Sequence, residues 1–256
     1  MHKKQSKEAS RHVEAVLSAL DILDCFQEHP ALTLKEIIDQ TGLTRSRAMR
    51  LIGTLEARDY LVGNPDRRTY HPGIKLAILA KSFEKNNQVE VLIRPMLKQL
   101  ANDTGESATF YVRDGIGRVA LAREEGHHGI RYVIREGQRH LLHRGGASSK
   151  VLIAFGPPDW QVKLPLEEAG DAQRMAEMIE TVRAQGYAVS KGENTPGAHS
   201  IAAPVFNTDR KLVGALAISG PSLRMTDEQI QKWVGLLVDA ANYLSRRLTT
   251  ICTMES

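Results

Sequence analysis

Apolar residues recur every three or four positions in the first part of the chain, which is the spacing of a helix with one apolar face. Residues 12–28 show this pattern, and Pro30 interrupts it. A second segment begins at Thr33, which forms a capping box with Glu36, and it ends at Gly42. The sequence therefore predicts two short helices in succession.

A third helical segment, with Thr44 as its N-cap, has two different faces. One side carries the apolar residues Ala48, Leu51, Ile52 and Leu55, and the other side with its flanks carries Ser46, Arg47, Met49, Arg50 and Gly53. Residues 61–71 then contain two short strand-like segments around a Pro-Asp turn. Helix, helix, tight turn, helix and hairpin is the order of a winged helix-turn-helix.

The pattern changes further along the chain. Residues 74–85 and 89–104 are again helical, but the segment "SATFYVRDGIGRVALARE" alternates apolar and polar positions around an Asp-Gly turn, as a β-hairpin does. Further strands are predicted at "GIRYVI", "GYAVS", "SIAAPVFN" and "KLVGALAIS", with helices at 148–155, 171–185 and 227–250. This mixture predicts an antiparallel sheet with helices on it rather than a Rossmann fold.

The fold class is therefore α+β, in three parts. Residues 1–72 form the winged helix-turn-helix, with a flexible basic tail at 1–11; residues 73–88 form a helical linker; residues 89–256 form the second domain. At 256 residues with 42% hydrophobic content, the chain is long enough for two cores. It has no apolar run of membrane-spanning length and no secretory signal, so we expect a cytoplasmic protein without a membrane partner.

Positive charge is unevenly distributed along the first domain. Residues 42–72 carry six arginines against three acids, whereas residues 13–41 carry one lysine and six acids. Residues 1–12 carry four basic residues against Glu8. Segregation of this kind is what an electrostatic footprint on nucleic acid requires.

The outer face of the third helix is the candidate DNA-binding surface. An α-helix fits the major groove, where arginine binds guanine edges and hydroxyls contact bases or phosphates. Free backbone amides at a helix start suit a phosphate, and basic residues at a wing tip suit a phosphate or the minor groove. The candidate residues are Thr33, Thr44, Arg45, Ser46, Arg47, Arg50, Arg67 and Arg68. The alternative, a charged face that only meets solvent, is disfavoured by the neighbouring helix, turn and wing.

A second candidate site is the segment "HRGGASSKVL", where small residues precede an apolar helix. Free amides, two hydroxyls and the positive end of a helix dipole would meet there, which favours an anion. The residues concerned are Gly146, Ala147, Ser148 and Ser149, and Lys150 would add charge if it turned inward. A tight packing corner that needs small side chains is the alternative.

The segment "VLSALDILDCFQEHPALTLKEIIDQTGLTRSRAMRLIGTLEARDYL" resembles the start of the IclR family of bacterial transcriptional regulators. The segments "TGESATFYV", "HRGGASSKVLIAF", "GYAVSKGENTPGAHSIAAPVF" and "ALAISGP" are similar to the effector-binding domain of that family, in the same order. Ser149 stands where many relatives carry glycine.

The resemblance implies a winged helix-turn-helix, a dimerising linker helix and a GAF-like domain that binds a small-molecule effector. It implies a homodimer or homotetramer on an inverted-repeat operator, and it adds Glu193, Ser200 and Ser219 to the effector site. We expect the helices at 73–88 and 227–250 to mediate self-association, and the effector to be a small organic or aromatic acid. Loop solvation or a strand-end hydrogen bond is the alternative for each added residue.

Enzyme chemistry has little support in the sequence. Walker A, G-x-G-x-x-G and Gly-x-Ser-x-Gly motifs are absent, and "ASSK" has Ala147 where an S-x-x-K motif needs serine. The histidines lack the spacing of a zinc site, so we expect no metal and no cofactor. An enzyme without DNA specificity, or a protein-interaction module docking through the helices at 89–104 and 227–250, remains the alternative to a regulator.

Overall fold

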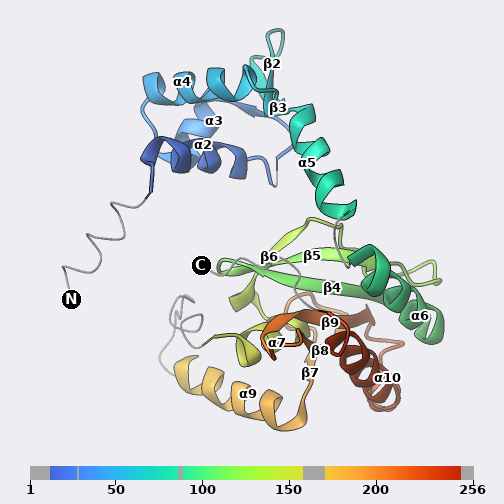
Figure 1. Ribbon diagram of the computed structural model, residues 1–256. Coiled ribbons are helices and arrows are strands. Elements are labelled where there is room, and N and C mark those ends of the chain that lie inside the picture. Colours follow the sequence, from blue (N-terminus) through green and yellow to red (C-terminus); the bar gives the residue numbers. More distant parts are fainter. Residues whose placement is uncertain (1–11, 28, 86–88, 158–170, 249–256) are drawn as a thin grey trace. The chain divides into compact units, whose positions relative to one another are not determined.

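The computed structural model describes residues 12–27, 29–85, 89–157 and 171–248 (Figure 1). The chain forms two compact units, Met1–Asn86 and Asn87–Ser256. The predicted basic tail at 1–11 lies outside the described residues, as does Cys252. Within the described ranges, no helix combines the length and the apolar character needed to cross a membrane.

The described part of the first unit contains three packed helices, one further helix that follows them, and a small sheet. The packed helices are α2 (Glu14–Asp24), α3 (Leu34–Thr41) and α4 (Arg45–Glu56), and the strands are β1 (Leu32–Thr33), β2 (Leu61–Asn64) and β3 (Thr69–Pro72). The sheet order is β1-β3-β2, with both pairs antiparallel. The winged helix-turn-helix prediction is confirmed. The two-residue strand β1 is an addition, since two residues are too few to show alternation.

Local chemistry sets the helix boundaries as predicted. The Thr33 hydroxyl accepts from the Glu36 amide, and the Glu36 carboxylate accepts from the Thr33 amide at 2.7 Å, which completes the capping box. Gly42 ends α3 with a φ of 68°, a left-handed conformation that glycine adopts without strain. Thr33 thus fixes where α3 begins, and Gly42 fixes where the short turn into α4 begins.

The apolar stripe of α2 lies mostly on the surface rather than in the core. Ile22 is fully buried with Ile37 and Ile52, but the large apolar residues of the preceding turns are 45–67% exposed: Val13, Val16, Leu17 and Leu20. The helix α5 (Ile74–Lys85) also exposes Ile74, Ile78 and Leu79. Two helices of this unit therefore present apolar side chains to solvent.

The second unit is a six-stranded antiparallel sheet covered by helices on both faces. Its strand order is β6 (Arg139–Leu141), β5 (Gly117–Glu124), β4 (Ser107–Asp114), β9 (Leu212–Pro221), β8 (Ala198–Phe206) and β7 (Ala188–Lys191). A π-helical turn, η1 (Val89–Ile93), leads into α6 (Arg94–Thr104), which packs on one face with α10 (Asp227–Ser245). A 3-10 turn, η2 (Leu142–Arg144), leads into α7 (Ala147–Phe155), which packs on the other face with α9 (Asp171–Gln185).

The two faces of this sheet differ in side-chain size. Towards α6 and α10 the central strands direct large residues: Phe110, Ile201, Leu216 and Ile218. Towards α7 they direct alanines: Ala120, Ala202, Ala215 and Ala217. Small side chains let a helix approach a sheet closely, so α7 can lie near the strands without clashing.

The predicted strand at "GIRYVI" is wrong. Residues 125–138 form a loop in which Ile134 is buried while Ile130 and Val133 are more than half exposed. The free edge of β5 pairs instead with β6. The segment "GIRYVI" has the alternating pattern of a strand, but β6 occupies the edge of β5 with which it would have to pair.

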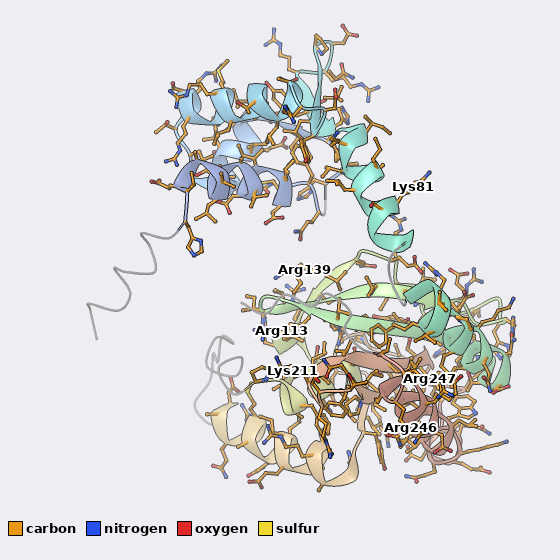
Figure 2. All side chains as sticks on the ribbon, in the orientation of Figure 1. Lys81, Arg113, Arg139, Lys211, Arg246 and Arg247 are labelled. Atoms are coloured by element: carbon orange, nitrogen blue, oxygen red, sulfur yellow. The ribbon has the colours of Figure 1, made fainter. Side chains whose placement is uncertain are left out.

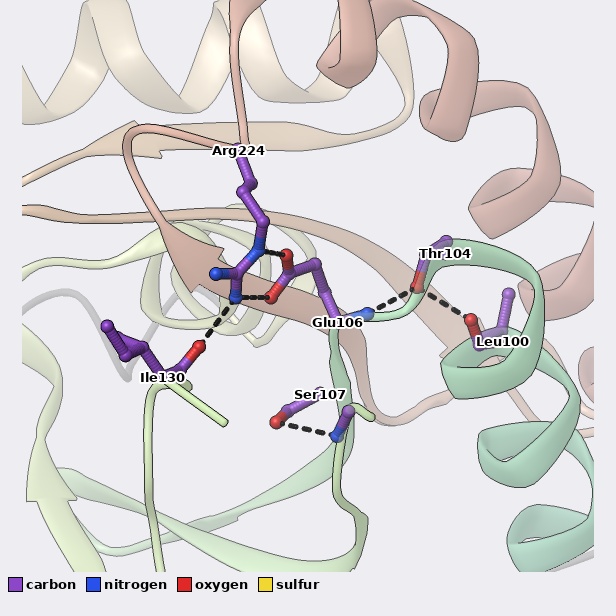
Figure 3. A network of polar contacts seen from close by, with 7 residues as sticks. Leu100, Thr104, Glu106, Ser107, Ile130 and Arg224 are labelled. Carbon is purple, nitrogen blue, oxygen red and sulfur yellow. Dashed lines mark hydrogen bonds and ion pairs between the residues drawn. The ribbon is translucent and has the colours of Figure 1, made fainter. Parts of the chain in front are cut away.

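A buried carboxylate fastens three segments of the second unit together (Figure 3). Glu106, 1% exposed at the start of β4, accepts two hydrogen bonds from the Arg224 guanidinium, which follows β9. The same guanidinium donates to the Ile130 carbonyl at 2.7 Å. Gly220 has no room for a side chain beside this carboxylate, since a Cβ there would lie 2.3 Å from Glu106 Oε2.

Candidate DNA-binding face and effector cavity

Helix α4 has the two faces that its sequence predicts. Ala48, Ile52 and Leu55 are buried, whereas Arg45, Ser46 and Arg50 are exposed. Side chains project from α4 and from the turn between β2 and β3 (Figure 2). The outer face of this helix is therefore available to a partner.

The two threonines among the candidates hold helix starts in place. Thr44 accepts a hydrogen bond from the Arg47 amide at 3.4 Å, and Thr33 belongs to the capping box described above. Each hydroxyl already has an intramolecular partner. These bonds orient the first turns of α3 and α4.

Arg47 differs from the other arginines of α4 because it already has an acidic partner. Its Nη1 lies 2.8 Å from Glu14 Oε1 on α2, and its side chain is 35% exposed. The sequence gives no signal for this pair, since 33 positions separate the two residues. An ion pair at this place competes with any phosphate or base for Arg47.

The wing places its two arginines in solvent. Arg67 and Arg68 are exposed in the turn between β2 and β3, and Arg68 has a left-handed φ of 52°. The Arg67 amide donates to Asn64 Oδ1 at 3.2 Å, which stabilises the turn. Gly53 of α4 has open space around it, so no contact within the described residues requires glycine there.

In the second unit, a cavity lies at the start of α7, where the alanine-rich face of the sheet ends. It holds about 400 Å³ of free space, including its open mouth. The lining residues are Tyr111, Arg118, Tyr132, Ile134, Gly146, Ser148, Ser190, Asn194, Thr195, Ala198, His199, Ser200, Ala217 and Ser219.

Four of the seven predicted effector residues line this cavity: Gly146, Ser148, Ser200 and Ser219. The other three lie beside it. Ala147 donates its amide to Ser200 Oγ at 3.4 Å. Ser149 is fully buried and accepts a hydrogen bond from Arg118, and Glu193 forms an ion pair with Lys150 at 2.5 Å. Lys150 is therefore engaged by Glu193 and by the Val189 carbonyl.

Sequence reasoning missed the charged residue of the cavity, Arg118. It lies two positions before Ala120 on β5, so period-two alternation places both on the α7 side of the sheet. Burial lowers the pKa of the Arg118 guanidinium, which remains positively charged at neutral pH. A single arginine in a strand-like segment carries no motif that would have drawn attention to it.

The aromatic and histidine residues supply polar atoms around Arg118. Burial raises the pKa of Tyr111 to about 12, so its hydroxyl stays neutral. The Tyr132 hydroxyl bonds to Thr195 Oγ1 at 3.2 Å. His199 Nδ1 lies 2.9 Å from the Met225 carbonyl, which can only accept, so Nδ1 carries a proton. Within the described ranges, no group of three or more His, Cys, Asp or Glu side chains could hold a metal ion.

Comparison with known proteins agrees with both units. Residues 15–65 match the IclR helix-turn-helix domain, and residues 83–246 match the bacterial transcriptional regulator IclR C-terminal domain. The chain is 30% identical to the HTH-type transcriptional regulator BhcR of Paracoccus denitrificans, over 93% of this chain and 88% of that protein. It is 29% identical to the HTH-type transcriptional regulator XynR of Escherichia coli, over 92% and 97% respectively.

Solved structures agree as well. The crystal structure of an IclR transcriptional regulator from a Silicibacter species superposes with a TM-score of 0.83 at 25% identity, covering 94% of this chain and 97% of that one. The relatives named here are transcriptional regulators, which rejects the enzyme and interaction-module alternatives. The chain belongs to the IclR family of bacterial transcriptional regulators, with a helix-turn-helix DNA-binding domain and a C-terminal effector-binding domain.

Proposed function

We propose that this regulator acts in the cytoplasm as a homodimer or homotetramer on an inverted-repeat operator. In each half-site, α4 enters the major groove with Arg45, Ser46, Arg47 and Arg50, and the wing brings Arg67 and Arg68 to the backbone. Within the described residues, no acidic side chain forms an ion pair with Arg45, Arg50, Arg67 or Arg68. Their charge is available to phosphates and guanine edges.

Self-association is assigned to α2 and α5 rather than to α10. The apolar side chains of α10 are mostly used inside the second unit: Ile230, Trp233, Leu237, Ala240, Ala241 and Leu244 are all buried. Leu17 and Leu20 on α2 and Ile78 on α5 are instead 45–54% exposed. Exposed apolar faces of this kind mark association surfaces. Two copies of α4 are needed because one winged helix contacts too few bases for specificity.

The effector proposed for the cavity is a small hydroxylated or aromatic acid. The observation that carries this proposal is the composition of the lining, which has five serine and threonine hydroxyls, two tyrosine hydroxyls and no acidic side chain. Hydroxyls at Ser148, Ser200 and Ser219 can bond the oxygen atoms of such a ligand. Glu193, held by Lys150 beside the cavity, would accept from a ligand hydroxyl rather than face a carboxylate.

The test begins with selection of an operator from random-sequence duplexes, followed by screening of carboxylic acids against the protein–DNA complex. Ser148→Leu should abolish the response to the acid found while leaving operator affinity unchanged, because the added side chain would fill the cavity. Ala176→Leu, an exposed position on α9, is the matched control. Ser149 is unsuitable for this purpose, since it is fully buried behind the cavity. An unchanged response in Ser148→Leu would place the effector site elsewhere.

A further inference from the structure

Arg118 is buried without an anionic partner. The residue is 3% exposed and lines the effector cavity. Its Nη1 donates to the Gly145 carbonyl at 3.2 Å and to Ser149 Oγ at 2.7 Å, and its Cζ lies 5.1 Å from the centre of the Tyr111 ring. Its Nε has no hydrogen-bond partner in the structure. All of these contacts are with neutral groups.

Two partly exposed arginines of the same unit are paired with carboxylates, whereas the buried Arg123, which does not line the cavity, donates to neutral oxygen atoms. Arg94 pairs with Glu136, and Arg139 pairs with Asp114, each at 2.8 Å. Their side chains are 28% and 26% exposed, so even partly solvated guanidinium groups have counter-ions here. A buried guanidinium needs a counter-ion more than these partly exposed ones do, because burial removes its charge from water.

The surroundings of Arg118 are shaped to admit a ligand atom and to hold the guanidinium still. Gly146 has a φ of 95°, and a Cβ there would lie 3.0 Å from Arg118 Nη1. A side chain at this position would therefore be strained and would crowd the guanidinium. Gly146 also begins α7, so the positive end of the helix dipole and the Arg118 charge meet at the same cavity.

We propose that Arg118 binds the carboxylate of the effector and thereby selects a ligand with one carboxylate group. One guanidinium neutralises one carboxylate, and the described lining offers no second permanent cation. Hydroxyls of the lining, such as those of Ser190 and Ser219, then face the uncharged part of the ligand. Ser149 is a positioning residue, which holds Arg118 from behind. This inference rests on the proposed effector cavity and identifies the group that recognises its ligand.

The test measures binding of simple acids and of their neutral amides to the full-length protein without DNA. The probes are acetate, glycolate, lactate and 4-hydroxybenzoate, each compared with its primary amide at millimolar concentrations by thermal shift and calorimetry. The wild-type protein should bind at least one acid about tenfold or more tightly than its amide, as a charge-assisted bond predicts. Arg118→Met should reduce that ratio to about one.

Two further variants separate recognition of the ligand from support of the fold. Arg118→Lys keeps the charge without the planar fork, so it should prefer acids to amides by a smaller factor. Arg139→Met, which removes a guanidinium outside the cavity, should keep the wild-type ratio. The melting temperature of ligand-free Arg118→Met should not fall below that of the wild type, because the variant removes an unpaired buried charge.

Two results would overturn the proposal. One is an acid-to-amide ratio in Arg118→Met equal to that of the wild type. The other is a wild-type protein that none of the four acids stabilises more than its amide. Since no DNA is present, neither result depends on operator binding, and a failure of α4 to bind an operator would leave this measurement intact.

Discussion

The outer face of α4 and the cavity at the start of α7 both present arginine, but in opposite surroundings. Arg50 is exposed on α4, where water screens its charge, whereas Arg118 is 3% exposed and touches only neutral groups. An exposed charge acts weakly and over a distance of roughly 10 Å, so several must act together on a polyanion. A buried charge acts strongly on the one anion that reaches it.

The comparison separates two kinds of recognition in one chain. Changes on the first unit should alter DNA affinity in a salt-dependent way and leave ligand binding alone. Changes in the cavity should alter ligand binding and leave the affinity for DNA unchanged.

The largest effect is expected from breaking self-association. Replacing Leu17 and Leu20 on α2 with Asp together should put charge into an apolar interface and separate the subunits. Operator affinity should then fall by roughly 10³-fold, toward non-specific binding, because only one half-site can be occupied. Sedimentation and fluorescence anisotropy measure the two quantities. Leu223→Asp, at a position 90% exposed in the second unit, is the control. An unchanged sedimentation coefficient in the variant with both Leu17 and Leu20 replaced would exclude α2 from the interface.

The next effect concerns the stability of the second unit alone. Glu106→Gln keeps the shape of the side chain but removes the charge that pairs with Arg224. The free energy of unfolding of this unit should fall by about 2 kcal/mol, since hydrogen bonds to a charged group are lost in a buried place. Hydrogen exchange should show faster opening of β4 and unchanged protection of α4. Equal losses of protection in both units would show that they unfold as one.

Arg50→Ala should weaken operator binding by about 1–3 kcal/mol and relax base preference at one position of each half-site. Anisotropy titrations on the operator and on random duplexes compare specific with non-specific binding. Lys75→Ala, which removes a cation outside the candidate face, serves as the control. Equal losses on both duplexes would leave Arg50 with a phosphate contact only.

The smallest effect should come from freeing Arg47. Glu14→Gln removes the carboxylate that pairs with Arg47 at 2.8 Å. Surface pairs of this kind contribute about 0.2–1 kcal/mol, so DNA affinity should rise only a few-fold at low salt and less at high salt. Glu28→Gln changes the net charge equally and is the control. A fall in affinity would mean that Glu14 orients Arg47 for DNA.

The first unit was largely predictable because its signals are local. Gly42, Thr33 and Glu36 set helix ends within a few residues of themselves, and the period of α4 separates its buried and exposed faces. The same period could not show that Leu17 and Leu20 face solvent. An apolar stripe looks identical whether it packs into a core or against another copy.

The cavity was only partly predictable because its geometry depends on distant pairs. Ser148 and Gly146 were identified from a local pattern of small residues before a helix. The bond from Arg118 to Ser149 joins positions 31 apart on different elements, and no local rule predicts it. For the same reason the pattern could not distinguish Ser148, which lines the cavity, from Ser149 behind it.

The central claim, that exposed arginines bind the operator while the cavity binds the effector, is tested most directly by one crossed titration. Operator affinity is measured by anisotropy for the wild type, Arg50→Ala and Ser148→Leu, with and without the acid identified by screening. Arg50→Ala should lose operator affinity yet bind the acid as the wild type does, and Ser148→Leu should keep operator affinity and lose the response. If either variant loses both properties while remaining folded, the two sites are not separate and the account is contradicted.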